Sequence, residues 1–222
     1  MTNYCGYMGR VALLDLSARK AENYVWTDLA REKYIGGKAM ASKILYDNLT
    51  GKETAFDPEN LIVIATGPLT GTGAPSSNRF DISSLSPLTG ITASSNCGGN
   101  FGHFLKKAGF DALIIRGKCE GPTWVEIENG EFRFHDAAGL WGLKISETQE
   151  ALQKTLNAAH GKPLRCGMVV IGPAGENRAC VWASLQITPR GCLVAVNGVL
   201  ANPRTKLRDG DTVYFFPAVA GG

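Results

Sequence analysis

Residues 61–75 read LIVIATGPLTGTGAP, and this stretch decides the fold class because it joins a buried strand to a long turn. Its first five residues form an uninterrupted apolar run of the length expected for a strand covered on both faces. Residues 66–75 are rich in glycine, proline and threonine, which are typical of turns and loops. The pattern predicts a domain built from short strands and tight connections.

Further strands are expected on both sides of this stretch. They alternate apolar and polar residues, or form short apolar runs bounded by turn residues. The expected strands cover residues 10–16, 23–27, 80–85, 90–94, 112–116, 123–127, 132–135, 165–171 and 181–185. Glycine accounts for 27 of the 222 residues without a regular repeat, so the backbone turns tightly in many places.

Helical patterns are fewer. A helix is expected to open near Thr27, and two more cover residues 39–48 and 101–108. The most regular pattern runs from 147 to 159, with Ser146 as N-cap and Gln149 completing a capping box. Because strands outnumber helices, the sequence predicts a strand-rich α+β fold rather than a doubly wound parallel sheet.

The sequence pattern changes at residues 188–191, where we place a domain boundary. The first domain is expected to span 1–190 and a smaller unit 191–222. In the smaller unit, short alternating strands at 193–197 and 212–217 are separated by tight turns. The chain then ends in Gly221-Gly222.

Composition excludes several classes of function. Hydrophobic residues make up 44% of the chain and the net charge is +3, too weak to indicate nucleic acid or a membrane surface as partner. No apolar run reaches the length of a membrane span and no signal peptide opens the chain, so a cytoplasmic location is expected.

The cysteines form no Cys-X-X-Cys pair and the histidines do not lie at ligand spacing with them. We therefore expect no disulfide framework, structural zinc site or iron–sulfur cluster from this chain alone.

Residues 4–190 resemble the N-terminal domain of the tungsten-containing aldehyde ferredoxin oxidoreductases. Several long motifs occur in the order of that family, which makes the resemblance specific. The matching stretches are YIGGK (34–38), ATGPLTGT (65–72), SPLTG (86–90), SNCGGNFG (95–102), AGFDALI (108–114), LWG (140–142) and IGPAGEN (171–177). The resemblance implies a β-rich base on which a bis-pterin tungsten cofactor lies.

The resemblance also implies roles for particular residues. Arg79 matches an arginine close to the cofactor and its iron–sulfur cluster, and Asn96 matches an asparagine that helps hold a magnesium ion between the pterin phosphates. Gly98 and Gly99 precede a predicted helix and would offer backbone N–H groups to a phosphate, although such glycine pairs also serve simply as turns. Lys38 stands where the family usually has arginine, which is not equivalent for bidentate contacts.

Residues 192–222 resemble the C-terminal part of the small, sulfur-carrying subunit of molybdopterin synthase, a β-grasp protein. The matching stretches are VAVNG (194–198), LRDGDTV (207–213) and FFPAVAGG (215–222). The resemblance implies a short β-grasp-like unit whose terminal Gly221-Gly222 carries sulfur as a thiocarboxylate on Gly222. The hairpin and helix that begin such a carrier are not recognisable here.

Together, the two resemblances predict a sulfur-carrier fusion in molybdenum- or tungsten-pterin cofactor biosynthesis. Its expected partners are a ubiquitin-activating-type adenylating enzyme and the catalytic subunit of molybdopterin synthase. The alternative is a noncatalytic module that binds the metal–pterin cofactor, or a subunit of an aldehyde ferredoxin oxidoreductase-type enzyme. A gene remnant with neither activity and a homo-oligomer also stay open. Because the family's catalytic domains are missing, the chain alone is not expected to oxidise aldehydes.

Overall fold

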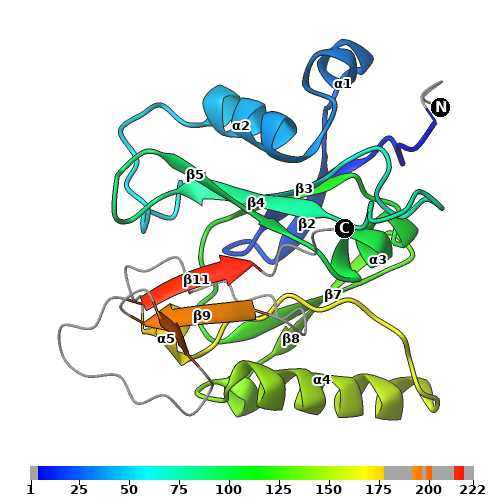
Figure 1. Cartoon of the computed structure of the whole chain (residues 1–222). Coiled ribbons are helices and arrows are strands. Elements are labelled where there is room, and N and C mark those ends of the chain that lie inside the picture. The colour runs from blue at the N-terminus through cyan, green and yellow to red at the C-terminus, as the bar shows by residue number, and fades with distance from the viewer. Residues whose placement is uncertain (1–4, 178–191, 197–198, 202–212, 218–222) are drawn as a thin grey trace. The chain divides into compact units, whose positions relative to one another are not determined.

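The main sheet of the molecule has six strands in the order β2-β1-β6-β3-β4-β5 (Figure 1). The structure is a computed structural model that describes residues 5–177, 192–196, 199–201 and 213–217. β1 pairs with β6 in parallel, and the other neighbouring strands of this sheet are antiparallel. This mixed sheet confirms the predicted strand-rich α+β class. The strands are β1 (Val11–Asp15), β2 (Lys20–Tyr24), β3 (Ile62–Thr66), β4 (Phe80–Leu85), β5 (Thr92–Cys97) and β6 (Ala112–Arg116).

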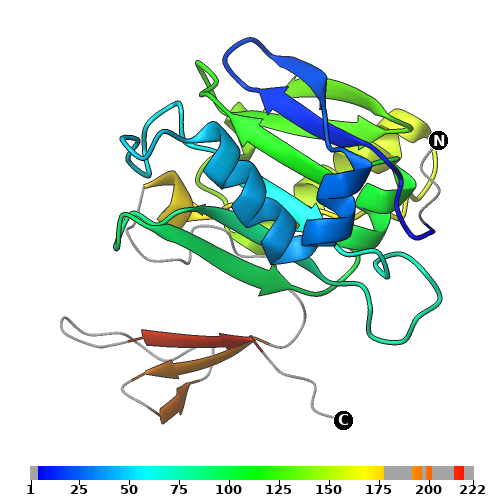
Figure 2. The ribbon, with the colours of Figure 1, turned by 90° about the horizontal axis from the view of Figure 1, so that it is seen from above.

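One face of this sheet is covered by α1 (Asp28–Tyr34) and α2 (Gly37–Asn48), which lie side by side in Figures 1 and 2. Alternate side chains of a strand point to the same face, so every second residue of the central strands meets α2. A continuous buried core results, formed by Val11, Met40, Ala41, Ile44, Leu45, Leu61, Val63, Ala65, Ala112 and Ile114. The apolar run that opens at Leu61 is thus buried as the sequence predicted.

The opposite face carries α3 (Phe101–Lys107), the hairpin of β7 (Thr123–Glu128) and β8 (Glu131–Asp136), and the long helix α4 (Ile145–His160) (Figure 1). The hairpin turns at Asn129 and Gly130, whose φ angles are 50° and 88°. Positive φ at both positions gives the tight two-residue turn that matches the twist of paired strands.

A buried ion pair ties the N-terminal segment to the sheet. Lys106 Nζ lies 2.6 Å from Asp111 Oδ1, and both side chains are almost fully buried. Asp111 also accepts hydrogen bonds from the backbone N–H groups of Met8 and Gly9, at 2.9 and 2.7 Å. Its carboxylate therefore fixes the path of the chain into β1.

Several predicted elements differ from the structure. The strands predicted at 23–27 and 90–94 lie at 20–24 and 92–97, and the strand predicted at 181–185 lies outside the described residues. Residues 165–171 form no strand, although they are apolar. The long helix begins at Ile145 rather than at residue 147, because Glu147 accepts a hydrogen bond from the Lys144 N–H at 2.9 Å. Lys144 is therefore the N-cap, and Ser146 and Gln149 lie inside the helix. Two short helical turns complete this part of the chain, a 3-10 turn (Ala138–Leu140) and α5 (Pro173–Glu176).

The chain divides into two compact units, residues 1–186 and 187–222. The second unit contains β9 (Cys192–Val196), β10 (Val199–Ala201) and β11 (Val213–Pro217), which form an antiparallel sheet in the order β10-β9-β11. The predicted boundary at 190/191 and the β-grasp identity of the tail stay predictions, and Gly221 and Gly222 lie outside the described residues. Among the helices described, none is long and apolar enough to cross a membrane.

Candidate functional site

The β4–β5 pair brings together two residues that the sequence singled out. Asp81 of β4 lies opposite Asn96 of β5 in the strand register. Arg79 precedes β4 directly, and its Nε donates a hydrogen bond to Asn96 Oδ1. Both side chains are exposed. The structure thus places a guanidinium and a side-chain amide next to each other on an open surface.

The loop before β4 holds Arg79 in place. Thr70 Oγ1 donates a hydrogen bond to the Arg79 carbonyl oxygen at 2.7 Å. The Gly71 N–H donates to Asn78 Oδ1 at 3.1 Å, which closes the loop just before Arg79. The threonines and glycines of this turn are therefore the groups that position the arginine.

A buried carboxyl lies beneath this surface. Asp81 is 2% exposed and accepts a 2.6 Å hydrogen bond from Ser83 Oγ. Burial raises the pKa of Asp81, while hydrogen bonds from Ser83 and Ser94 and the charge of Lys38 oppose that shift. Helix α2 packs against β4. Sequence reasoning missed Asp81, for which the available signal is a carboxylate inside an otherwise buried strand.

The N-terminus of α2 adds backbone donors. Gly36 is the N-cap and makes no side-chain cap hydrogen bond. The first N–H groups of a helix lack partners within the helix and carry partial positive charge. A Cβ on Gly36 would lie 2.5 Å from the Thr66 carbonyl oxygen, so glycine lets α2 begin tightly against the end of β3. Lys38, the second residue of the 12-residue helix, adds a full positive charge.

The second glycine pair follows β5. Gly99 has φ +89°, and a Cβ on Gly98 or Gly99 would meet nothing within 4 Å. Neither glycine is needed for packing against described residues, so this turn offers open backbone beside Asn96. Helix α3 begins two residues later, at Phe101.

We give these candidate residues the joint name α2-side surface: Gly36, Gly37, Lys38, Arg79, Asn96, Gly98 and Gly99. It combines two cations, one amide and accessible backbone N–H groups, which suit the oxygens of a phosphate or another anion. The structure joins Arg79 and Asn96 by a hydrogen bond, and Gly98 and Gly99 begin two residues after Asn96. Their part in cofactor binding stays a prediction.

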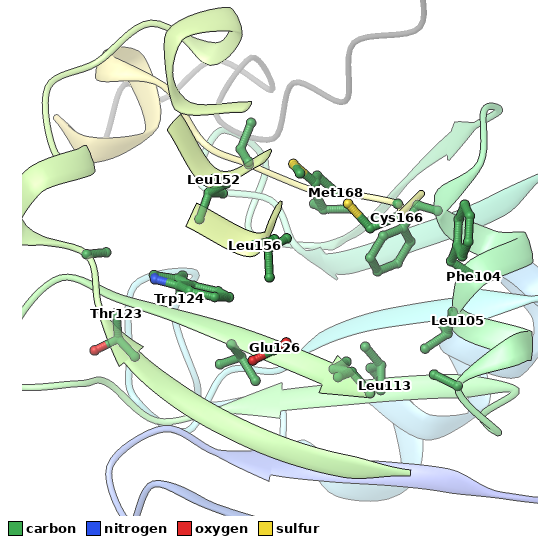
Figure 3. A pocket seen from close by; sticks show the side chains of 18 of the residues that line it. Phe104, Leu105, Leu113, Thr123, Trp124, Glu126, Leu152, Leu156, Cys166 and Met168 are labelled. Carbon is green, nitrogen blue, oxygen red and sulfur yellow. The ribbon is translucent and has the colours of Figure 1, made fainter. Parts of the chain in front are cut away.

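A cavity of about 710 Å³ lies on the other side of the main sheet (Figure 3). Leu113 of β6, Trp124 of β7 and Leu152 of α4 line it, together with Cys166 and Met168 of the irregular segment before α5. The lining is mainly apolar. This cavity and the α2-side surface therefore differ in the chemistry that they offer.

Comparison with known proteins gives a consistent result. The family described as "Aldehyde ferredoxin oxidoreductase, N-terminal domain" matches residues 11–198. A tungsten-containing aldehyde ferredoxin oxidoreductase of Pyrococcus abyssi is 36% identical over 173 residues, covering 78% of this chain and 28% of the relative. An aliphatic sulfonate oxidoreductase, WOR-like subunit, of Pyrococcus furiosus is 33% identical over 182 residues, covering 78% and 29%.

A solved structure agrees with these relatives. The active-site complex BamBC of benzoyl coenzyme A reductase, in complex with 1,5-dienoyl-CoA, superposes with a TM-score of 0.75 at 36% sequence identity. The superposition covers 79% of this chain and 26% of that chain. This chain thus spans less than a third of the length of these relatives.

The predicted sulfur-carrier fusion in pterin-cofactor biosynthesis is wrong. The relatives are oxidoreductases or their subunits. The family match also extends to residue 198, into the segment 192–222 that carried the prediction. The assignment of Gly221 and Gly222 as sulfur-carrying residues is not tested, because both lie outside the described residues. The relatives do not support the adenylating enzyme and the molybdopterin synthase subunit as partners.

Proposed function

The chain belongs to the family of aldehyde ferredoxin oxidoreductase N-terminal domains, and we propose that it is the cofactor-binding module or subunit of an oxidoreductase of this type. The observation that carries the proposal is the hydrogen bond between Arg79 and Asn96 on an open surface. In this proposal the metal–pterin cofactor lies against the α2-side surface.

The residues present fit the phosphate groups of such a cofactor. Arg79 offers a planar guanidinium and Lys38 an ammonium, both suited to phosphate oxygens. Asn96 offers an amide oxygen of the kind that Mg²⁺ accepts. The glycine pairs leave room for a ligand to approach the backbone, since a Cβ at Gly37, Gly98 or Gly99 would meet no described atom within 4 Å.

The metal of the named relatives supports tungsten rather than molybdenum in this proposal. The bound cofactor would supply the redox chemistry. The chain's own residues would bind and orient the cofactor through its phosphate end and balance the negative charge of those phosphates. Activity would require the remaining part of the enzyme, because the chain spans 28% of the length of the Pyrococcus abyssi relative.

Exposed apolar side chains support a partner at the end of the β4–β5 pair remote from Arg79 and Asn96. Leu88 and Ile91, in the connection between β4 and β5, are 75% and 67% exposed. Neighbouring exposed apolar groups are typical of protein interfaces. We propose that a catalytic domain or subunit covers this connection.

The test is the pterin and tungsten content of the chain purified with its oxidoreductase partner. Arg79→Ala and Asn96→Ala are expected to lower both by about 10-fold or more, since each removes a charge-assisted or metal-directed contact. Arg165→Ala and Asn23→Ala, at exposed positions outside the α2-side surface, are matched controls that should retain the cofactor. Unchanged content in the Arg79 and Asn96 variants would contradict the proposal.

A further inference from the structure

A cluster of titratable side chains lies on the opposite side of the main sheet from the α2-side surface. Glu126 and Glu128 are alternate residues of β7 and therefore point to the same face of the hairpin. His160 ends α4, and each of the three offers one ligand atom within 4.8 Å of the others. Residues 34 positions apart in the chain, Glu126 and His160, thus meet through the packing of α4 on the hairpin.

We propose that Glu126, Glu128 and His160 form a binding site for a divalent transition-metal ion. Glu126 Oε1 and His160 Nε2 lie 3.4 Å apart. Two ligand atoms at about 2.0–2.1 Å from a tetrahedral zinc ion are separated by roughly 3.3 Å. This pair already has the spacing of zinc ligands, and Glu128 is near enough to complete a three-residue site with water in the fourth position.

The cluster is half-buried. The side chains of Glu126, His160 and Glu128 are 14%, 24% and 39% exposed. Glu126 is the most enclosed of the three side chains, and its carboxylate faces His135, His160 and Arg133.

Two neighbours would support a bound ion. His135 Nε2 lies 3.0 Å from Glu126 Oε2, the oxygen that does not face His160. Such a contact orients a ligating carboxylate from outside the metal site, which makes His135 a positioning residue. The C-terminus of the 16-residue α4 ends at His160, and the partial negative charge of a helix C-terminus favours a cation there.

Arg133 is the cation that now balances these carboxylates. Its Nη1 lies 3.1 Å from Glu128 Oε2 and 3.7 Å from Glu126 Oε2. Because its side chain is 51% exposed, it can turn into solvent when an ion binds. One imidazole with two carboxylates favours zinc, cobalt or manganese over magnesium, which prefers an all-oxygen shell.

The experiment is calorimetric titration of the full, reduced chain with ZnCl₂, repeated with CoCl₂ under visible and near-ultraviolet absorption. We expect one high-affinity zinc ion per chain. Glu126→Gln and His160→Asn should each weaken binding by about 10-fold or more, and His135→Gln by about 10-fold. Arg133→Gln should tighten it, because the competing cation is gone. Circular dichroism verifies that each variant is folded.

Glu150→Gln is the matched control, because it removes a carboxylate of α4 that lies ten residues before His160, roughly 15 Å along the helix. It should leave zinc affinity unchanged. Zinc affinity that is equal in wild type, Glu126→Gln and His160→Asn would overturn the proposal, as would absence of stoichiometric binding. A strong near-ultraviolet thiolate–cobalt band would also overturn it, by placing the ion on the chain's cysteines.

Discussion

Asp81, near the α2-side surface, is a carboxylic acid in an unusually buried environment. Its carboxyl is 2% exposed, and it shares a 2.6 Å hydrogen bond with Ser83. Because burial disfavours the ionised form, its pKa is raised above the ordinary value of 3.8, despite the nearby charge of Lys38. Packing of α2 on β4 therefore forces a carboxyl into a site that favours its neutral form.

This raised pKa predicts a pH dependence of stability. The contribution of Asp81 to stability is largest below pH 3.8 and is lost as the pH rises through the raised pKa of the folded state. Asn at this position keeps an acceptor for Ser83 but does not ionise. The free energy of unfolding of Asp81→Asn, relative to that of wild type, should therefore increase as the pH rises from about 3.5 to 7. Urea unfolding at several pH values measures this difference, and a constant difference would contradict the prediction.

At the scale of elements, the close approach of α2 to β3 positions the α2-side surface. The start of α2 lies against the last residue of β3, where a Cβ on Gly36 would be 2.5 Å from the Thr66 carbonyl oxygen. Backbone cannot move aside cheaply, so any side chain at Gly36 must push the helix start outward. Both the Lys38 charge and the free N–H groups of α2 move with it.

Gly36→Ala is expected to destabilise the chain by about 1–3 kcal/mol, in the range of overpacked interiors. It should also weaken cofactor retention, because Lys38 and the backbone N–H groups at the start of α2 move. Gly73→Ala is the matched control, since a Cβ there meets nothing within 4 Å. Thermal or urea unfolding of both variants checks the prediction. Equal stability of the two variants would show that the start of α2 tolerates a side chain.

Elements with a strong local signal could be predicted from the sequence, and those that depend on pairing could not. The run that opens at Leu61 is buried, and β4 has the predicted bounds of 80–85. Residues 165–171 are equally apolar, yet they pair with no strand in the described part of the chain. Apolarity indicates burial, but pairing requires a neighbouring strand that the local sequence does not reveal. The start of α4 also differs from its local signal: the Lys144 N–H donates a hydrogen bond to Glu147, so Lys144 rather than Ser146 is the N-cap.

At the scale of the whole molecule, the two faces of the main sheet carry different chemistry. The α2-side surface was partly predictable, because Arg79 and Asn96 lie in motifs that resemble a known family. Their hydrogen bond depends on the β4–β5 register, which the motifs do not contain. The Glu126–Glu128–His160 cluster could not be predicted, because its members lie in elements whose contact exists only after folding.

The most direct test of the account is hydrogen–deuterium exchange of the chain in its oxidoreductase complex, with and without the metal–pterin cofactor. The account predicts that the cofactor slows exchange in peptides covering residues 36–40 and 95–100, which contain the start of α2 and the second glycine pair. Peptides covering β7 should exchange at the same rate in both states. Protection confined to β7 and α4, or no protection at residues 36–40 and 95–100, would contradict the assignment of the cofactor to the α2-side surface.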